Sequence, residues 1–232
     1  MIGKDAGKSF AYILGVYLGD GAVTKWNAPG RTERLMFRLN TIDQDFAEAT
    51  KQALQDLSTY KVSICCHAVS KSSKPNHALS LGDRQLCERL IADTDKKRII
   101  PEYVFGWPRE NKLAFIAGLM DSEGYVAANG NHTGRRFYMG FKSCDLWVDD
   151  FARLLQSVGI LIGKIGVENP RFSGYKTPRR FAIKMQSWID SGARFNIARK
   201  QARVDEWAAT APDPRGYRFR AKLTPETTCT AP

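Results

Sequence analysis

Two runs of nearly continuous apolar residues stand at matching places in the two halves of the chain. The first, 10–18, is followed by GDG at 19–21, and the second, 116–120, is followed by DSEG at 121–124. A helix that is apolar on every side is buried on every side, and glycine commonly follows the last turn of a helix. The pattern predicts two buried helices that end in the acids Asp20 and Glu123, which are 103 positions apart.

Each run is followed by a stretch in which apolar residues alternate with mostly polar ones. The inward positions are Leu35, Phe37 and Leu39 in the first half and Phe137, Met139 and Phe141 in the second. The outward positions are Arg34, Met36, Arg38 and Asn40, and then Arg136, Tyr138, Gly140 and Lys142. A period of two is typical of a strand with one buried side, so the pattern predicts an equivalent half-buried strand in each half.

The remaining pattern predicts the same order in both halves: helix, two strands, helix, two strands, helix. Ser9, Asp43 and Asp145 are suitable N-cap residues for three of the helices, and Pro108 suits the first turn of the helix that holds the second run. The chain is therefore expected to be α+β, with two pseudo-symmetric αββαββα units. Each antiparallel sheet would pack one face under helices and leave a polar face open, and the two open faces together would form a saddle.

The expected boundaries follow from this repeat. We predict a first half at 1–92, a charged and proline-containing linker at 93–107, a second half at 108–210 and a proline-rich tail at 211–232. The last strand pair of the second half is expected near 163–168 and 180–186, with a short helix from about Trp188. A basic loop with interleaved aromatic residues, 171–180, joins these strands.

Composition narrows the class of partner and the compartment. The chain has 232 residues and a formal net charge of +11, and a protein this basic usually binds a polyanion. No apolar run reaches the roughly 18 residues of a membrane span, and the first residues lack a secretion signal. The five cysteines show no CxxC spacing, which argues for reduced thiols rather than a zinc site. We expect an intracellular protein that is not secreted and does not bind a membrane.

The two motifs resemble the signature of the LAGLIDADG homing endonucleases, in the single-chain form that carries two motifs. The second, 116–124, is the closer match, whereas the first departs from it at Tyr17 and Leu18. The resemblance extends over about 9–207, because the order of elements between the motifs also fits. The sequence KRIIP at 97–101 is similar to linkers of this family.

The resemblance implies that the two motif helices pack together on a pseudo-twofold axis. Gly15 and Gly19 are four positions apart, as are Gly118 and Ser122, so small residues would let the helix backbones approach closely. The acids Asp20 and Glu123 would then lie side by side at the centre of the basic surface.

Two carboxylates beside DNA phosphates require cations between them. Mg²⁺ prefers oxygen ligands, and such ions can activate water in a phosphoryl displacement. We therefore expect Asp20 and Glu123 to be catalytic metal ligands, with the backbone carbonyls of Gly19 and Ser122 completing the site. Mn²⁺ or Ca²⁺ can substitute for binding. Asp121 is interpreted as structural.

The resemblance also implies supporting groups around the acids. Lys97 (or its neighbour Lys96) and Lys200 would stabilise charge near the cleaved phosphates. Thr41 and Ser143, each at the end of the second strand of its half, would line the active site. The residues expected to contact DNA are Arg34, Arg38, Asn40, Thr41, Arg136, Tyr138, Lys142, Ser143, Lys184 and Gln186.

The function implied is a monomeric endonuclease that makes a double-strand break with short 3′ overhangs in a long, non-palindromic DNA site. One alternative is an RNA-binding intron-splicing maturase of the same fold, whose partner would be intron RNA. A second is a DNA-binding relative that has lost cleavage, although the retention of both acids argues against it.

Overall fold

The computed structural model describes six segments of the chain. They are residues 7–26, 33–67, 75–131, 134–143, 147–167 and 178–210, with the backbone alone described at 129–131 and 134–136. The N-cap prediction at Asp145 and most of the basic loop at 171–180 lie outside these residues. The proline-rich tail predicted at 211–232 also lies outside them.

The elements follow the predicted order twice. The first unit consists of α1 (Lys8–Leu18), β1 (Ala22–Trp26), β2 (Arg34–Thr41), α2 (Gln44–Leu57), β3 (Ser63–His67), β4 (Asn76–Leu81) and α3 (Arg84–Asp93). The second consists of α4 (Arg109–Ser122), β5 (Gly124–Asn131), β6 (Gly134–Ser143), α5 (Val148–Ser157), β7 (Gly166–Val167), β8 (Arg179–Ile183) and α6 (Met185–Asp190). A short 3₁₀ helix, η1 (Glu102–Gly106), precedes α4, and α7 (Ala198–Thr210) follows α6. The α+β class and the repeated αββαββα order are confirmed.

Each unit contains one four-stranded antiparallel sheet. The strand orders are β1-β2-β4-β3 and β5-β6-β8-β7, and all pairs are antiparallel. The register is also repeated, because Ala22 pairs with Arg38 in the first sheet and Tyr125 pairs with Gly140 in the second. Phe37 and Phe141, on the predicted inward faces, are fully buried.

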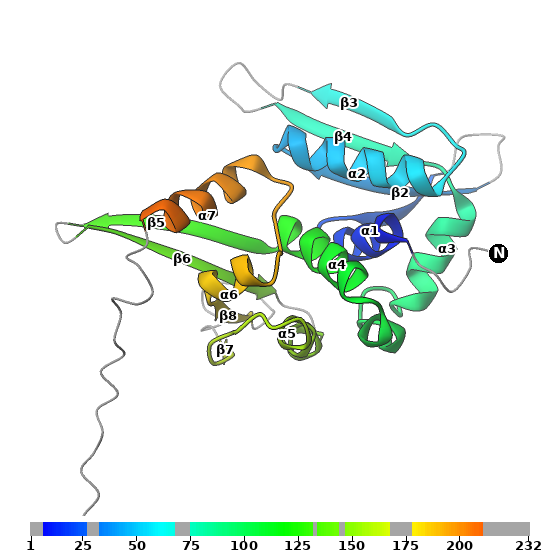
Figure 1. The fold of residues 1–232 in the computed structure, drawn as a ribbon. Helices are drawn as coiled ribbons and strands as arrows, with labels where there is room; N and C mark the ends of the chain where they lie inside the picture. The colour runs from blue at the N-terminus through cyan, green and yellow to red at the C-terminus, as the bar shows by residue number, and fades with distance from the viewer. Residues whose placement is uncertain are drawn as a thin grey trace, which may run out of the picture.

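The two apolar helices lie side by side between the sheets (Figure 1). Every residue from Phe10 to Leu18 is buried, which explains why α1 lacks a polar face. Trp107, just after η1, contacts both Phe10 of α1 and Phe115 of α4, with ring centroids 6.4 Å apart in each pair. Within the described segments, no helix is long and apolar enough to cross a membrane.

Of the predicted helix caps, Ser9 is wrong, whereas Asp43 is confirmed in position but lacks a capping hydrogen bond. Helix α1 begins two residues earlier than expected, with Gly7 at its N-cap, and the Ser9 hydroxyl instead donates a hydrogen bond to Asp56. Asp43 does occupy the N-cap position of α2, but its side chain makes no capping hydrogen bond. Its carboxylate accepts two hydrogen bonds from Arg199 instead, a partner 156 positions away that no local pattern indicates.

The last strand is shorter than predicted, and the placement of Lys184 and Gln186 on it is wrong. Strand β8 ends at Ile183, Lys184 is the N-cap of α6, and Gln186 lies in the first turn of that helix. The Gln186 amide donates to Asp190 along the helix at 2.8 Å. Met185 continues the alternation of buried residues in the strand, but it is also three positions before the buried Trp188, a spacing typical of a helix. In the fold these two residues belong to α6.

Candidate active site between the motif helices

Helices α1 and α4 touch through their glycines in a reciprocal way. A Cβ atom added at Gly15 would lie less than 3.0 Å from the carbonyl oxygen of Phe115, and one added at Gly118 would lie equally close to that of Tyr12. Both pairs obey the offset of 103 positions. A Cβ at Gly19 would collide with Ser122 in the same way. The absence of side chains at these positions therefore sets the close approach of the two backbones.

This contact brings the two predicted catalytic acids to the same end of the helix pair. The Cγ atom of Glu123 lies 3.4 Å from the position a Gly19 Cβ would take, and Asp20 directly follows Gly19. The Asp20 side chain is exposed and that of Glu123 is half-buried. Although Asp20 is exposed, the protein atoms around its carboxyl displace part of its hydration and raise its pKa, while the charges of Lys200 and Lys97 oppose that rise.

Lys97 binds the end of α1. Its ammonium donates to the carbonyl oxygens of Gly19 at 2.5 Å and Gly21 at 3.1 Å. A cation is favourable there because unpaired carbonyls give the C-terminal end of a helix partial negative charge. Of the two lysines considered for this role, the structure brings Lys97 to the site. No hydrogen bond joins Lys96 to the motif helix in the described residues.

Lys200 binds the end of α4 in an equivalent way. Its ammonium donates to the carbonyl oxygens of Met120 at 3.0 Å and Asp121 at 2.6 Å, and it follows Lys97 by 103 positions. Only 5% of Lys200 is exposed. Desolvation lowers its pKa to about 8, with the negative charge of Asp121 acting in the opposite direction.

The oxygen atoms at the helix ends fit a hard divalent cation. Asp20 and Glu123 supply one carboxylate from each unit, and carboxylates with backbone carbonyls and water are the ligands that Mg²⁺ and Ca²⁺ prefer. The Gly19 carbonyl, one of the expected ligands, is hydrogen-bonded to Lys97. The Ser122 hydroxyl turns back to the Gly118 carbonyl at 3.1 Å. No group of three or more His, Cys, Asp or Glu that could hold a metal occurs within the described segments.

Asp121 lies at the centre of a buried hydrogen-bond network behind the active site. Its carboxylate accepts from the Tyr12 hydroxyl at 3.0 Å, from the Asn196 amide side chain at 3.0 Å, and from the backbone N–H groups of Asn196 and Ile197. Burial raises the pKa of Asp121 to about 6, although the donors from Asn196 and Tyr12 lower it. The network joins α1, α4 and the segment before α7, which fits the structural role expected for this acid.

The predicted DNA-contacting residues fall into groups of different accessibility. The exposed ones are Arg34, Arg38 and Asn40 on β2, Tyr138 and Lys142 on β6, and Lys184 and Gln186 at the start of α6. Thr41 is half-buried and accepts the backbone N–H of Asp43 at 3.1 Å, whereas Ser143 is buried. Arg136 belongs to β6, but its side chain is outside the described atoms. The structure thus places Asp20, Glu123, Lys97 and Lys200 together and spreads the other residues over β2, β6 and the start of α6.

Comparison with solved structures identifies the fold. A mesophilic variant of the homing endonuclease I-DmoI is 18% identical, with a TM-score of 0.53 over 82% of this chain and 94% of that one. An I-DmoI E117A variant in complex with its target DNA is 16% identical, with a TM-score of 0.55 over 84% of this chain and 98% of that one. This chain has the LAGLIDADG homing endonuclease fold. The resemblance drawn from the two motifs is confirmed.

The sequence comparisons are weaker and cover less. No family model matches the chain. The homothallic switching endonuclease of Saccharomyces cerevisiae is 27% identical over 142 residues, which are 53% of this chain and 22% of that protein. The chain therefore spans less than a quarter of the length of that curated relative. The LAGLIDADG fold is established by structure rather than by these matches.

One residue on the open face of the second LAGLIDADG unit was missed. Tyr125 lies two positions after Glu123, is 39% exposed, and pairs with Gly140. A Cβ at Gly140 would collide with the Tyr125 hydroxyl, so the ring lies across this glycine. In the equivalent pair of the first unit, the first strand carries the small residue, Ala22, and the second strand carries the large one, Arg38. Gly140, a glycine among the outward residues of an alternating strand, was the feature of the sequence that could have indicated a large neighbour there.

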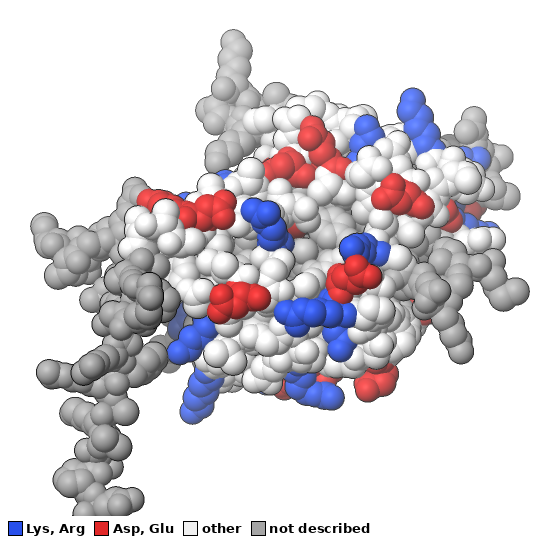
Figure 2. All heavy atoms as spheres, viewed as in Figure 1, with Lys and Arg blue, Asp and Glu red and all other residues white. Residues whose placement is uncertain are grey.

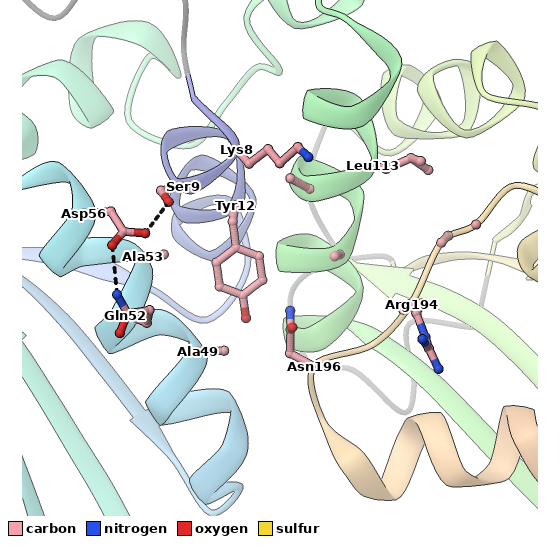
Figure 3. Close-up of a pocket in the computed structure, with 14 residues that line it drawn as sticks. Lys8, Ser9, Tyr12, Ala49, Gln52, Ala53, Asp56, Leu113, Arg194 and Asn196 are labelled. Carbon is pink, nitrogen blue, oxygen red and sulfur yellow. Dashed lines mark hydrogen bonds between the residues drawn. The ribbon is translucent and has the colours of Figure 1, made fainter.

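A cleft of about 470 Å³ lies away from the two acids (Figure 3). It is lined by residues of α1, α2, α4 and the segment 192–196. Tyr12 and Asn196 reach it from either side, and both bind Asp121. Asp20 and Glu123 are not among its lining residues, so this cleft is not the candidate active site of the LAGLIDADG fold.

Proposed function

We propose that this chain is a site-specific, metal-dependent DNA endonuclease that cuts both strands of a long, non-palindromic duplex and leaves short 3′ overhangs. The observation that carries the proposal is that Asp20 and Glu123, one from each unit, lie at the same end of the paired motif helices, beside two lysines that bind the ends of these helices. I-DmoI, which shares the fold, has been solved with its target DNA in the presence of Mg²⁺ and with DNA and Mn or Ca. We propose that the chain acts as a monomer, because its two units supply both acids.

We propose that the two repeated units make equivalent contributions to cleavage. We propose that 1–92 and 108–210 are the two units and that 93–107 joins them. Each unit supplies one acid and one sheet. The residues at equivalent positions differ, as Met36 and Tyr138 do, so the two units should recognise unlike half-sites.

The acids and lysines have distinct roles in this proposal. Asp20 and Glu123 would hold divalent cations, with the Gly19 and Ser122 carbonyls as further ligands. A cation bound there would lower the pKa of a water molecule bound to it and neutralise charge at the phosphate. Lys97 and Lys200 keep the carbonyl ends of α1 and α4 in place and add positive charge beside the acids, where a phosphate would approach.

The open faces of the sheets are the proposed DNA surface. The exposed guanidinium groups of Arg34 and Arg38 make no hydrogen bond or ion pair with any described residue, so both remain available to phosphate or guanine. Asn40 is also exposed on β2, and Tyr138 and Lys142 are exposed on the equivalent strand β6. On the face of the molecule drawn in Figure 2, by contrast, Lys and Arg are interspersed with Asp and Glu. We assign the DNA to the sheet faces for this reason.

The test is selection of cleaved sequences from a library of DNA duplexes, followed by assays on the selected site with Mg²⁺ and with Ca²⁺. Asp20→Asn and Glu123→Gln should each lower double-strand cleavage by about a thousandfold or more while leaving DNA binding in Ca²⁺ intact. The matched control is Asp150→Asn, an acid on α5 that pairs with Arg153 at the surface. Binding of intron RNA without cleavage of any DNA would instead support the maturase function and overturn the proposal.

A further inference from the structure

We propose that each unit of the chain braces the active-site lysine that serves the other unit, with Asp43 and Trp147 as positioning residues. The inference rests on the proposed function, because it concerns how Lys97 and Lys200 are held. It goes beyond that function, because it makes the lysine at each cutting site depend on a contact with the other unit.

The first brace runs from α2 of the first unit to the start of α7. Arg199 donates to both carboxylate oxygens of Asp43, at 2.6 Å and 2.8 Å, and the backbone N–H of Ala198 donates to Asp45. Two parallel hydrogen bonds between a guanidinium and a carboxylate are strong and geometrically specific. Carboxylates at the first turn of a helix also favour its positive end. Together these contacts attach the first turn of α7 to the first unit.

This attachment sets the position of Lys200. Lys200 directly follows Arg199 and is the third residue of α7, so its backbone is part of the attached turn. From there its ammonium reaches the Met120 and Asp121 carbonyls at the end of α4. A shift of the turn away from Asp43 would therefore carry Lys200 away from the helix end that precedes Glu123.

The second brace runs from the core of the second unit to Lys97. The indole N–H of Trp147 donates to the Lys97 carbonyl oxygen at 3.1 Å. Trp147 is 1% exposed and packs against Phe141, with ring centroids 5.9 Å apart. It is therefore a rigid donor presented by the second unit to the residue that binds the end of α1.

The backbone around Lys97 needs such support. Asp95, Lys96 and Lys97 have φ angles of 42°, 55° and 71°, a left-handed run that is unfavourable for residues other than glycine. Such a run persists only where the surroundings determine it. Thr94 supplies the local contacts, because its hydroxyl accepts the Lys97 N–H at 3.0 Å and its carbonyl accepts the Arg98 N–H at 2.8 Å. Trp147 supplies the contact from the other unit.

The experiment compares the cutting rates of the two DNA strands, each labelled separately, in single-turnover assays on the selected site with Mg²⁺. Lys97→Met and Lys200→Met define which strand depends on which lysine. Asp43→Asn should slow the strand that Lys200→Met slows, and Trp147→Phe the one that Lys97→Met slows, each by about tenfold or more, as expected for a displaced catalytic group. DNA binding in Ca²⁺ should not change. The double variant Asp43→Arg with Arg199→Asp should recover the strand lost in Asp43→Asn.

Matched controls separate bracing from general stability. Trp188→Phe removes a buried indole N–H for which the described residues offer no partner, and Asp150→Asn removes a surface pair with Arg153 within α5. Both controls should leave the ratio of the two strand rates unchanged. Equal slowing of both strands by Asp43→Asn and Trp147→Phe, with strand-selective lysine variants, would overturn the bracing alone. Lysine variants that cut both strands at the normal rate would overturn the lysine roles and the bracing together.

Discussion

Gly15 of α1 and Gly118 of α4 each lie against the backbone of the opposite helix. An added methyl group at either position would press on a carbonyl oxygen, that of Phe115 or Tyr12. Because these oxygens belong to helix backbones, they cannot move aside without shifting the helix. The separation of the two helices, and with it the placement of Asp20 and Glu123, therefore depends on these two glycines.

Substitution of either glycine by alanine should separate the helices. We expect Gly15→Ala and Gly118→Ala each to lower the free energy of unfolding by about 1–3 kcal/mol, as overpacking of a tight core does. Cleavage should fall further than stability explains, since both acids move. Urea unfolding and cleavage rates at a temperature where the variants stay folded would measure this. The control is Gly82→Ala, where an added Cβ meets no atom within 4 Å, and a loss of stability as large as that of Gly15→Ala would contradict the explanation.

The buried ammonium of Lys200 should make stability depend on pH in the alkaline range. Its folded pKa of about 8 lies below the ordinary value of 10.5, so between these values the unfolded chain binds more protons than the folded one. The stability of the native chain should therefore increase with pH, relative to Lys200→Met, by up to about 3 kcal/mol between pH 8 and 10.5. Urea unfolding of both proteins across this range is the measurement. A difference that stays constant with pH would show that Lys200 titrates normally.

The hydrogen bond from Tyr12 to Asp121 should couple the motif helices energetically. Tyr12→Phe should cost about 1 kcal/mol, and Asp121→Ala more, because it leaves several buried donors without an acceptor. In a double-mutant cycle, the coupling energy of the pair should be about 0.5–3 kcal/mol. Additive effects of the two substitutions would mean that the contact contributes nothing of its own. The Asp150→Asn variant provides a surface reference.

Arg38 and Tyr125 should contribute to DNA binding in different ways, although they come from equivalent strand pairs. Tyr125 is the equivalent of Ala22, which pairs with Arg38. Loss of a guanidinium that contacts phosphate removes about one unit from the slope of log affinity against log salt, so Arg38→Ala should flatten that slope. Tyr125→Phe removes no charge and should leave the slope unchanged while altering discrimination among bases near the cut. Binding in Ca²⁺ at several salt concentrations, with matched and altered sites, would test both. An equal change of slope in the two variants would contradict this assignment.

Much of the architecture follows from short-range patterns in the sequence. The apolar runs, the alternation around Phe37 and Phe141, and the spacing of Gly15 and Gly19 are local features, and each reports which side of an element is buried. Their return at an offset of 102 or 103 positions indicated two equivalent units and paired Asp20 with Glu123. The same offset relates Lys97 to Lys200, although these lysines were chosen from their place in each half.

What the tertiary structure alone decided is how distant segments meet. Asp43 occupies the N-cap of α2, but its carboxylate binds Arg199. Asp121 accepts hydrogen bonds from Tyr12 and Asn196, 109 and 75 positions away. Gln186 fitted a strand by alternation, yet it lies on a helix because Met185 and Trp188 are buried at helical spacing. These outcomes depend on hydrogen bonds and packing between residues far apart in the chain. A local pattern carries no information about such partners, whereas it does determine which residues need to be buried.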